Sequence, residues 1–219
     1  MISGDRKAII FDMDGTIVDN MHIHLETWLS FLSNHNIHLD KDGFERQGHG
    51  NLTEIISRIF KLKKSDPEVM RLGQAKEQFY RESYQGRVEE ISGFKKTVER
   101  LRQNGIGRAL ATMGDTPNID IVVDTLNIRH YFESIIGGHE VENGKPHPEI
   151  FLKTLNRLEL TPKDCIVIED SISGIQAAIN ANIRVIGITT SHGHEQLMDA
   201  GCFATISNYE DYDLTEFLP

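Results

Sequence analysis

The amino-acid sequence predicts an α/β protein with a doubly wound, mainly parallel sheet and a helical bundle inserted after the first strand. Two observations lead to this fold class. Short, unbroken apolar segments alternate with helical patterns over the second half of the chain, which is typical of crossover connections between parallel strands. The stretch between the first strand and residue 90 shows helical periodicity and no convincing strand. We therefore expect an α/β core from residues 1–17 and 90–219, and a helical insert from residues 18–89.

Composition and charge exclude several classes of protein. Hydrophobic residues make up 39% of the 219 residues and charged residues 26%, which is typical of a globular chain. The net charge of −10 disfavours nonspecific binding to nucleic acid, and no apolar stretch reaches the ~18–20 residues that span a bilayer. Cys165 and Cys202 fit neither a zinc spacing nor a disulfide framework, and the N-terminus has no signal-peptide pattern. We expect a cytoplasmic monomer with no nucleic-acid or membrane partner.

The first strand is the apolar run from Ala8 to Phe11, which is followed at once by Asp12 and Asp14. In an extended segment, side chains two positions apart lie on the same face. Two carboxylates this close repel each other unless a cation or a shared proton intervenes, so the pattern indicates a bound metal and acid/base chemistry. A plain Asp-x-Asp-Gly turn is the alternative interpretation. A helix–loop–helix calcium site is excluded, because its twelfth position, residue 23, is Ile and not Glu.

The helical insert shows three sets of helix signals. Residues 21–34 carry an apolar stripe at helical spacing, and a polar break with several glycines follows over residues 41–50. Asn51 and Glu54 have the spacing of a capping box that starts a second helix. Asp66-Pro67 is typical of the first turn of a third helix.

The rest of the chain alternates between strands and helices. We expect strands at residues 108–112, 134–136, 165–168 and 185–188, and an edge strand at 203–206. We expect helices that begin at Ser92, Asp115, Pro148 and the 171–174 region, each at a capping or first-turn signal.

Polar side chains follow several of these strands at the point where each strand ends. Thr112 follows one strand, and Glu169 and Asp170 follow another. Ligands of parallel sheets bind at the carboxyl ends of the strands, so these groups are candidates to join Asp12 and Asp14. Lys145 lies in a loop stiffened by two prolines, which reduces the entropy of holding an ammonium group in place. The alternatives are that Lys145 is a solvated loop residue and that the strand-end groups are helix caps.

The order of these motifs resembles the haloacid dehalogenase superfamily over nearly the whole chain. The four motifs are strand–Asp-x-Asp-Gly-Thr, strand–Thr, Gly-Lys-Pro and strand–Glu-Asp. The insert is similar to the four-helix cap of the first subclass of that superfamily. Residues 144–151 and 168–178 are similar to the beta-phosphoglucomutase and small sugar-phosphatase group. The resemblance implies a Rossmann-like core that carries a helical cap.

The resemblance also implies a role for each motif residue. Asp12 would be the nucleophile that becomes an aspartyl phosphate, and Asp14 would be the general acid and base. Magnesium would bind the Asp12 carboxylate, the Asp14 carbonyl oxygen and Asp170, with Glu169 in the outer shell. Two side chains would hold the phosphoryl oxygens: Thr112 and Lys145.

Substrate choice is expected to lie in the cap. His24 falls at the position where the mutases carry a His near the acid/base carboxylate. In the cap loop, Gln47 precedes Gly48, and Asn51 stands where the mutases would have an Arg that grips a second phosphate. This departure favours simple hydrolysis. The candidate substrate contacts in the cap are His24, Arg46, His49 and Asn51.

The resemblance therefore predicts a magnesium-dependent phosphatase that acts on a small sugar phosphate or similar metabolite. Three alternatives stay open: a beta-phosphoglucomutase-type isomerase, an inorganic pyrophosphatase, and a catalytically idle protein that binds a metabolite or a partner.

Overall fold

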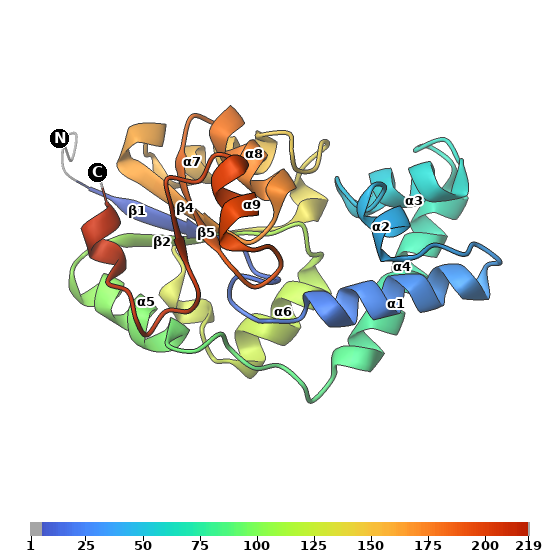
Figure 1. The fold of residues 1–219 in the computed structure, drawn as a ribbon, viewed down its shortest axis with the longest axis horizontal. Helices are drawn as coiled ribbons and strands as arrows, with labels where there is room; N and C mark the ends of the chain where they lie inside the picture. Colours follow the sequence, from blue (N-terminus) through green and yellow to red (C-terminus); the bar gives the residue numbers. More distant parts are fainter. Residues whose placement is uncertain (1–5, 219) are drawn as a thin grey trace.

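The computed structural model describes residues 6–218, and its centre is a six-stranded parallel sheet (Figure 1). The strand order is β3-β2-β1-β4-β5-β6, so the first strand in sequence lies in the interior of the sheet. The strands are β1 (Ala8–Phe11), β2 (Gly107–Ala111), β3 (Ser134–Ile136), β4 (Cys165–Glu169), β5 (Arg184–Ile188) and β6 (Ala204–Ile206). The predicted fold class is confirmed, and β6 lies at the edge, as expected.

Helices cover both faces of the sheet (Figure 1). Because successive side chains of a strand point to opposite faces, Ile9 and Phe11 of β1 pack into one hydrophobic cluster and Ala8 and Ile10 into another. The first cluster includes residues of α5 and α6, and the second includes residues of α7, α8 and α9. These helices are α5 (Phe94–Gln103), α6 (Thr116–Thr125), α7 (Glu149–Leu158), α8 (Ile172–Asn180) and α9 (His194–Asp199). Four 3₁₀ turns are η1 (Arg129–Tyr131), η2 (Gly138–Glu140), η3 (Pro162–Asp164) and η4 (Leu214–Phe217).

Four helices lie between β1 and α5 in the sequence, and we refer to them as the cap. They are α1 (Met21–Asn34), α2 (Lys41–Glu45), α3 (Leu52–Phe60) and α4 (Pro67–Tyr84). Figure 1 shows them gathered to one side of the sheet. They enclose a hydrophobic cluster of their own, which contains Trp28, Leu32, Ile56 and Leu72. A cluster of this kind allows the four helices to hold together apart from the sheet.

The two chain segments that join the cap to the core run side by side. The Ile91 amide donates a hydrogen bond of 2.8 Å to the Ile17 carbonyl oxygen, and Val18 forms an antiparallel bridge with Glu90. Val18 also bridges to Asp14. The domain boundaries at 17/18 and 89/90 stay predictions, and this paired junction lies at both of them.

The structure differs from the sequence-based expectation at three elements. The polar break over residues 41–50 contains the short helix α2, which Asp40 caps by accepting a 2.7 Å hydrogen bond from the Gly43 amide. Helix α5 is capped by Gly93 and not by Ser92. Gly93 has a φ of 85°, and a Cβ atom there would lie 2.6 Å from the amide nitrogen of Glu210, so this close approach requires glycine. Helix α9 had no clear signal in the sequence.

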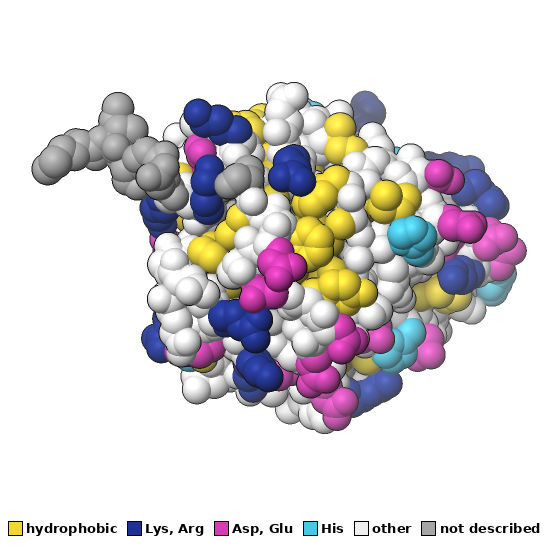
Figure 2. Space-filling model, turned by 60° about the vertical axis from the view of Figure 1, so that its left-hand side comes forward, with side chains coloured by type: hydrophobic (Ala, Val, Ile, Leu, Met, Phe, Trp, Pro, Cys, Tyr) yellow, Lys and Arg dark blue, Asp and Glu magenta, His cyan; other side chains and the backbone are white. Residues whose placement is uncertain are grey.

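The surface carries charges of both signs. On the face shown in Figure 2, Lys and Arg side chains are intermingled with Asp and Glu. Within residues 6–218, no helix combines the length and the apolar character needed to cross a membrane. The expectation of no nucleic-acid partner stays a prediction.

Candidate active site

The site lies at the carboxyl edge of the sheet, where β1 and β4 are neighbours. Asp12 directly follows β1, and its amide donates a hydrogen bond of 3.1 Å to the carbonyl oxygen of Ile168 in β4. This pairing brings Asp12 beside Glu169 and Asp170 at the end of β4. One carboxylate oxygen from each of the three residues lies within 4.8 Å of the others, and all three side chains are buried. The structure thus gathers three acids of two sequence motifs into one buried cluster.

Lys145 reaches this cluster from the loop before α7. Its ammonium group donates hydrogen bonds of 2.7 Å to Asp12 Oδ1, 2.6 Å to Glu169 Oε1 and 3.2 Å to the Ala111 carbonyl oxygen. The lysine is only 4% exposed, so it is not a solvated loop residue. Burial opposes its charge, but the nearby Asp12 and Glu169 carboxylates raise the pKa of Lys145 overall. Lys145 is therefore a fixed cation between two carboxylates.

The cluster contains more carboxyl groups than cationic groups, and crowding and burial disfavour their ionisation. The pKa of Asp12 is raised to about 8: burial is the largest cause, the Glu169 and Asp14 carboxylates add to the rise, and Lys145 opposes it. Burial, with Glu169 and Asp12, also raises the pKa of Asp170 well above its usual value. Carboxylate oxygens are hard donors, so three buried carboxyl groups beside one lysine fit a divalent cation such as magnesium. The cation would supply positive charge that allows all three groups to ionise.

Glu169 is held by donors of the protein on both of its oxygens. Lys145 binds Oε1, and the amide and hydroxyl of Ser171 each donate a hydrogen bond of 2.9 Å to Oε2. A Cβ atom at Gly174 would lie 1.7 Å from Glu169 Oε1, so only glycine lets helix α8 approach this carboxylate. The arrangement suits a residue that orients the metal ligands from the outer shell.

Asp170 is oriented by residues that follow β5. The Ser191 hydroxyl donates a hydrogen bond to Asp170 Oδ2, and the His192 ring lies 3.1 Å from the Asp170 carbonyl oxygen. Ser191 was not a site residue in the sequence analysis, because nothing in its local sequence links it to Asp170. Asp170 itself does not cap α8; Ser171 does.

The Asp14 carboxylate faces the cap. Its Oδ1 accepts a hydrogen bond of 2.6 Å from Asn20 Nδ2 and lies 3.4 Å from His24 Nε2. The His24 ring stacks on Tyr80, with 3.8 Å between ring centroids, and the Tyr80 hydroxyl oxygen accepts a 2.7 Å hydrogen bond from Asn20. Burial opposes ionisation, but His24 and Asn20 outweigh it and lower the pKa of Asp14. The ionised form, which is able to accept a proton, is thus favoured. Asn20 and Tyr80 are additions to the residues predicted from sequence.

Thr112 directly follows β2, the other neighbour of β1, and is buried. Its amide donates a hydrogen bond of 3.0 Å to the Ile136 carbonyl oxygen, and its hydroxyl oxygen accepts one of 3.1 Å from the Gly114 amide. The hydroxyl thus fixes the turn at the end of β2. A role in phosphate binding stays a prediction.

The candidate substrate residues of the cap loop lie around the start of α3. Asn51 is the N-cap: its Oδ1 accepts a 2.9 Å hydrogen bond from the Glu54 amide, and its Nδ2 donates one of 3.1 Å to the Glu142 carbonyl oxygen. Both ends of this side chain therefore contact protein. The His49 carbonyl oxygen accepts a 2.9 Å hydrogen bond from Arg58, and burial and the Arg58 charge lower the pKa of the His49 ring. Arg46 follows the last residue of α2.

The structure also reveals a buried ion pair in the cap that sequence reasoning missed. Lys76 Nζ lies 2.8 Å from Glu77 Oε1, and both side chains are buried. Glu77 Oε2 accepts a hydrogen bond of 2.5 Å from Asn118 of α6, so the pair also joins the cap to the core. The available signal was that position 76 falls on the apolar stripe of α4, four residues from both Leu72 and Tyr80.

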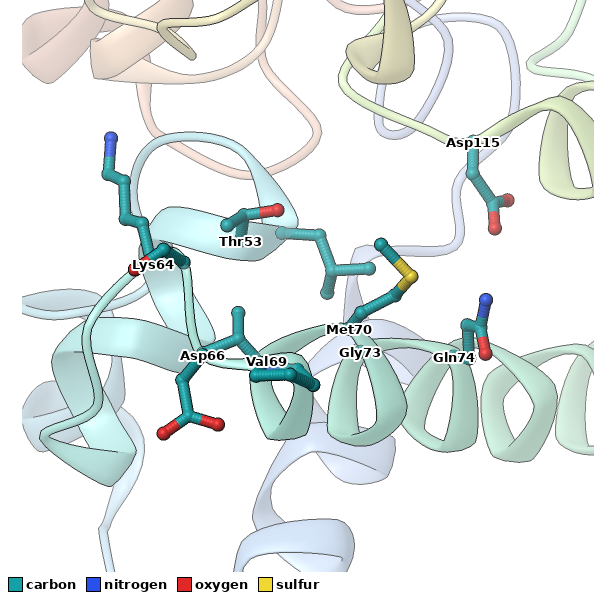
Figure 3. A pocket seen from close by; sticks show the side chains of 11 residues that line it. Thr53, Lys64, Asp66, Val69, Met70, Gly73, Gln74 and Asp115 are labelled. Carbon is teal, nitrogen blue, oxygen red and sulfur yellow. The ribbon is translucent and has the colours of Figure 1, made fainter.

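A cavity of about 480 Å³ opens between cap and core near this contact (Figure 3). The cap side is formed by Thr53, Met70, Gly73 and Gln74, and Asp115 of the core faces them. Asp115 caps α6 and follows the turn at Thr112. The cavity is lined almost wholly by the cap, and its lining includes neither Thr112 nor a residue of the acidic cluster.

The fold and the site together define a capped α/β enzyme with an acidic cluster at the carboxyl edge of its sheet. The sequence model of the haloacid dehalogenase-like hydrolases matches residues 9–188, and the chain belongs to this family. The predicted family is thus confirmed.

Individual relatives cover nearly the whole chain. The chain is 30% identical over 216 residues to a phosphorylated carbohydrates phosphatase of Thermotoga maritima, a match that covers 93% of this chain and 95% of that protein. A family IA hydrolase structure from Entamoeba histolytica has a TM-score of 0.85 at 26% identity and covers 96% of both chains. The beta-phosphoglucomutase structure of Clostridium difficile has a TM-score of 0.84 at 26% identity, covering 97% of this chain and 95% of that one.

Proposed function

We propose that this hydrolase is a magnesium-dependent phosphatase that acts on a small phosphorylated sugar or similar metabolite through an aspartyl-phosphate intermediate. The observation that supports this most is the Asp12 carboxylate, held by Lys145 inside the buried acidic cluster. The relative from Thermotoga maritima is named as a phosphatase of phosphorylated carbohydrates, which supports the reaction and the substrate class.

In the first half of the reaction, a carboxylate oxygen of Asp12 attacks the phosphorus atom. The bond between phosphorus and the ester oxygen breaks, and Asp14, which enters this half with the proton that it took from water in the preceding turnover, donates it to that oxygen so that a neutral alcohol leaves. Lys145 and Thr112 hold the phosphoryl oxygens. The Lys145 ammonium group also reduces the repulsion between Asp12 and the incoming phosphate dianion.

In the second half, Asp14 accepts a proton from a water molecule, whose oxygen attacks the phosphorus of the aspartyl phosphate. The bond between phosphorus and Asp12 breaks, and inorganic phosphate leaves with the carboxylate restored. Asn20 and His24 orient Asp14 for both proton transfers, because both contact its Oδ1. Closure of the cap excludes bulk water while the intermediate exists.

The residues that would hold magnesium are Asp12, through its carboxylate, Asp14, through its carbonyl oxygen, and Asp170. Glu169 would orient this set from the outer shell. When bound, magnesium supplies positive charge that offsets the negative charge of the transferring phosphoryl group.

We expect the part of the substrate that is not phosphate to bind between the cap and the core. His24, Arg46 and His49 are the proposed cap contacts. Asn51, the fourth candidate, binds protein at both ends of its side chain and is better assigned to the cap–core contact.

A phosphate-release screen tests the proposal. The panel contains sugar phosphates, phosphoglycolate, nucleotides and pyrophosphate, each with magnesium and with EDTA. We expect release from one or more small sugar phosphates that requires magnesium. Release at the same rate in EDTA contradicts the metal requirement. A clear preference for pyrophosphate over every ester identifies an inorganic pyrophosphatase. Binding of a metabolite without turnover of any compound identifies an idle binding protein.

A beta-phosphoglucomutase-type isomerase is the second candidate, because the likeness to the Clostridium difficile enzyme covers nearly the whole of both chains. Incubation with a hexose 1-phosphate and a trace of hexose bisphosphate separates the two functions. Free phosphate indicates the phosphatase, and hexose 6-phosphate indicates the mutase. We expect free phosphate, since Asn51 replaces the Arg that the resemblance to the mutases leads one to expect.

A further inference from the structure

The N-terminus of cap helix α3 is joined to the core loop that precedes Lys145. Glu54 Oε2 accepts a hydrogen bond of 3.1 Å from the Gly144 amide of the core and one of 2.8 Å from the Asn51 amide of the cap. Its other oxygen lies 2.9 Å from Lys64 Nζ. Asn51 adds a second hydrogen bond across the same boundary, to the Glu142 carbonyl oxygen. One carboxylate therefore ties two backbone amides, one from each side, together.

The two backbones approach each other so closely here that a side chain would not fit. A Cβ atom at Gly144 would lie 2.1 Å from the amide nitrogen of Asn51 and 2.3 Å from the carbonyl carbon of Gly50. The φ angle of Gly144 is not in the left-handed region, so its own conformation does not require glycine. The absence of a side chain at residue 144 serves only the contact with the cap.

The residue after Gly144 is Lys145, whose ammonium group lies between Asp12 and Glu169. We propose that Glu54 is a positioning residue: by binding the Gly144 amide it latches the closed cap to the loop that carries Lys145, so that cap closure and placement of the lysine occur together. This inference rests on the proposed function for its kinetic consequence, because Lys145 is there a phosphate-binding group. The latch itself is a physical contact that is measured without a substrate.

The first test is Glu54→Gln, which keeps the capping box because Gln serves at that position as well as Glu. The remaining carbonyl oxygen can still accept the hydrogen bonds of the Asn51 and Gly144 amides, while the negative charge and the ion pair with Lys64 are lost. Hydrogen bonds to charged groups are stronger than those to neutral ones, so the closed state should weaken about fivefold to tenfold. We expect the Gly144 amide to exchange its hydrogen faster by that factor, and kcat/KM to fall by a similar factor with an unchanged melting temperature.

Glu68→Gln is the matched control. Glu68 is an exposed cap residue whose carboxylate pairs with Arg71 on the same helix and has no core partner among the described contacts. This variant should leave the Gly144 exchange rate and kcat/KM as in the unchanged protein.

A second variant, Gly144→Ala, obstructs the same contact from the other side. Since the backbone conformation at residue 144 permits alanine, we expect the fold to be retained and the cap to stay open, with accelerated exchange over residues 142–145. If both variants act through one contact, the double variant should lose no more kcat/KM than the more damaging of the two single variants.

Two results would overturn the latch. One is an unchanged Gly144 exchange rate in Glu54→Gln, and the other is a double variant whose losses add. Because the exchange measurement needs no substrate, a failure of the proposed phosphatase activity and a failure of the latch are distinguished.

Discussion

Three buried carboxylates share one ammonium group at the carboxyl edge of the sheet. Asp12 and Glu169 each accept a hydrogen bond from Lys145, whereas Asp170 accepts one only from a neutral hydroxyl, that of Ser191. Crowding of like charges in a buried site is unfavourable without a cation. The cluster therefore costs stability in the protein without metal, a cost that active sites commonly carry for their function.

Substitution of Asp12 tests the covalent step. In Asp12→Asn the amide has almost the same shape but is not a nucleophile, so phosphate release should fall about a thousandfold or more. Phosphate release with magnesium is the measurement, and a thermal melt checks that the fold is retained. Retention of more than a few per cent of the rate contradicts an aspartyl-phosphate mechanism.

Substitution of Asp170 tests the charge crowding. Asp170→Asn removes one negative charge and keeps an oxygen that accepts a hydrogen bond from Ser191. In EDTA at pH 8, we expect a melting temperature a few degrees above that of the unchanged protein. Phosphate release should fall by at least about a hundredfold. Loss of an outer-shell partner costs up to that factor, and Asp170 is a proposed direct ligand. Asp124→Asn, at an exposed acid, is the control for a simple change in net charge. A lower melting temperature than this control would contradict the interpretation.

Local sequence was sufficient to select Asp12, Asp14, Lys145 and Asp170 as candidates, because each lies in a short motif at a strand end or in a stiffened loop. Their assigned roles stay predictions. The partners of Asp14 and His24, Asn20 and Tyr80, could not be predicted from local sequence. Asn20 and Tyr80 are 60 residues apart and meet only because α4 packs beside α1.

Helix α4 carries a charged pair on its buried face. Lys76 lies against aromatic rings, with its Nζ 4.6 Å from the centre of the Trp28 ring and 5.3 Å from that of Tyr80. Glu77 is the carboxylate that compensates its charge. A buried charge that loses its partner is strongly destabilising, whereas the complete pair adds little to stability.

Removal of one partner of the Lys76–Glu77 pair should lower the free energy of unfolding more than removal of both charges. Glu77→Gln should lower the free energy of unfolding by about 3 kcal/mol, because Lys76 is left buried without a counter-charge. The double variant Lys76→Met with Glu77→Gln should recover most of that loss. Urea unfolding followed by Trp28 fluorescence measures both, and the exposed Glu82→Gln of the same helix is the control. Equal stability of Glu77→Gln and the control would contradict a structural role for the pair.

Elements with a local start signal were predicted well. The capping box of Asn51 and Glu54, Asp66 before Pro67, and Asp115 before α6 are all present. Ser92 was wrong as a cap because its carbonyl oxygen accepts a hydrogen bond from Tyr209, more than a hundred residues later. That contact with the C-terminal segment draws the chain close at Gly93, and no local pattern contains it.

For the whole molecule, the alternation of strands and helices was enough to predict a parallel sheet with both faces covered. The order of the strands was not predicted, because it depends on which crossovers pack on which face. The contact between α3 and the loop before Lys145 was not predicted either. Its hydrogen-bond donors include backbone amides, which a pattern of side chains does not reveal. A cytoplasmic location and a monomeric state stay predictions.

The acidic cluster makes the stability of the whole fold depend on pH, and we expect magnesium to change that dependence. Asp12 has a pKa of 3.8 when unperturbed and about 8 in the folded protein without metal, so the folded state holds a proton that the unfolded state has released. Stability in EDTA should therefore fall as pH rises from about 4 to about 8. Magnesium should reverse this loss, because it binds the folded state alone. Thermal melts from pH 5 to 8, with EDTA and with magnesium, measure the effect. A magnesium-induced increase that is larger at pH 5 than at pH 8 would contradict it.

The paired junction between cap and core has a consequence for how the cap was acquired and how it moves. Because Ile17 and Ile91 are hydrogen-bonded to each other, the chain leaves the core and returns to it at a single point. Excision of the intervening residues would leave two ends close enough for a tight turn, which is the geometry of an inserted unit, and Tyr80 and Tyr84 of α4 still pack into the core cluster. We expect the cap to move mainly by rotation about this junction. Since Val18 bridges to Asp14, the junction lies beside the proposed general acid and base.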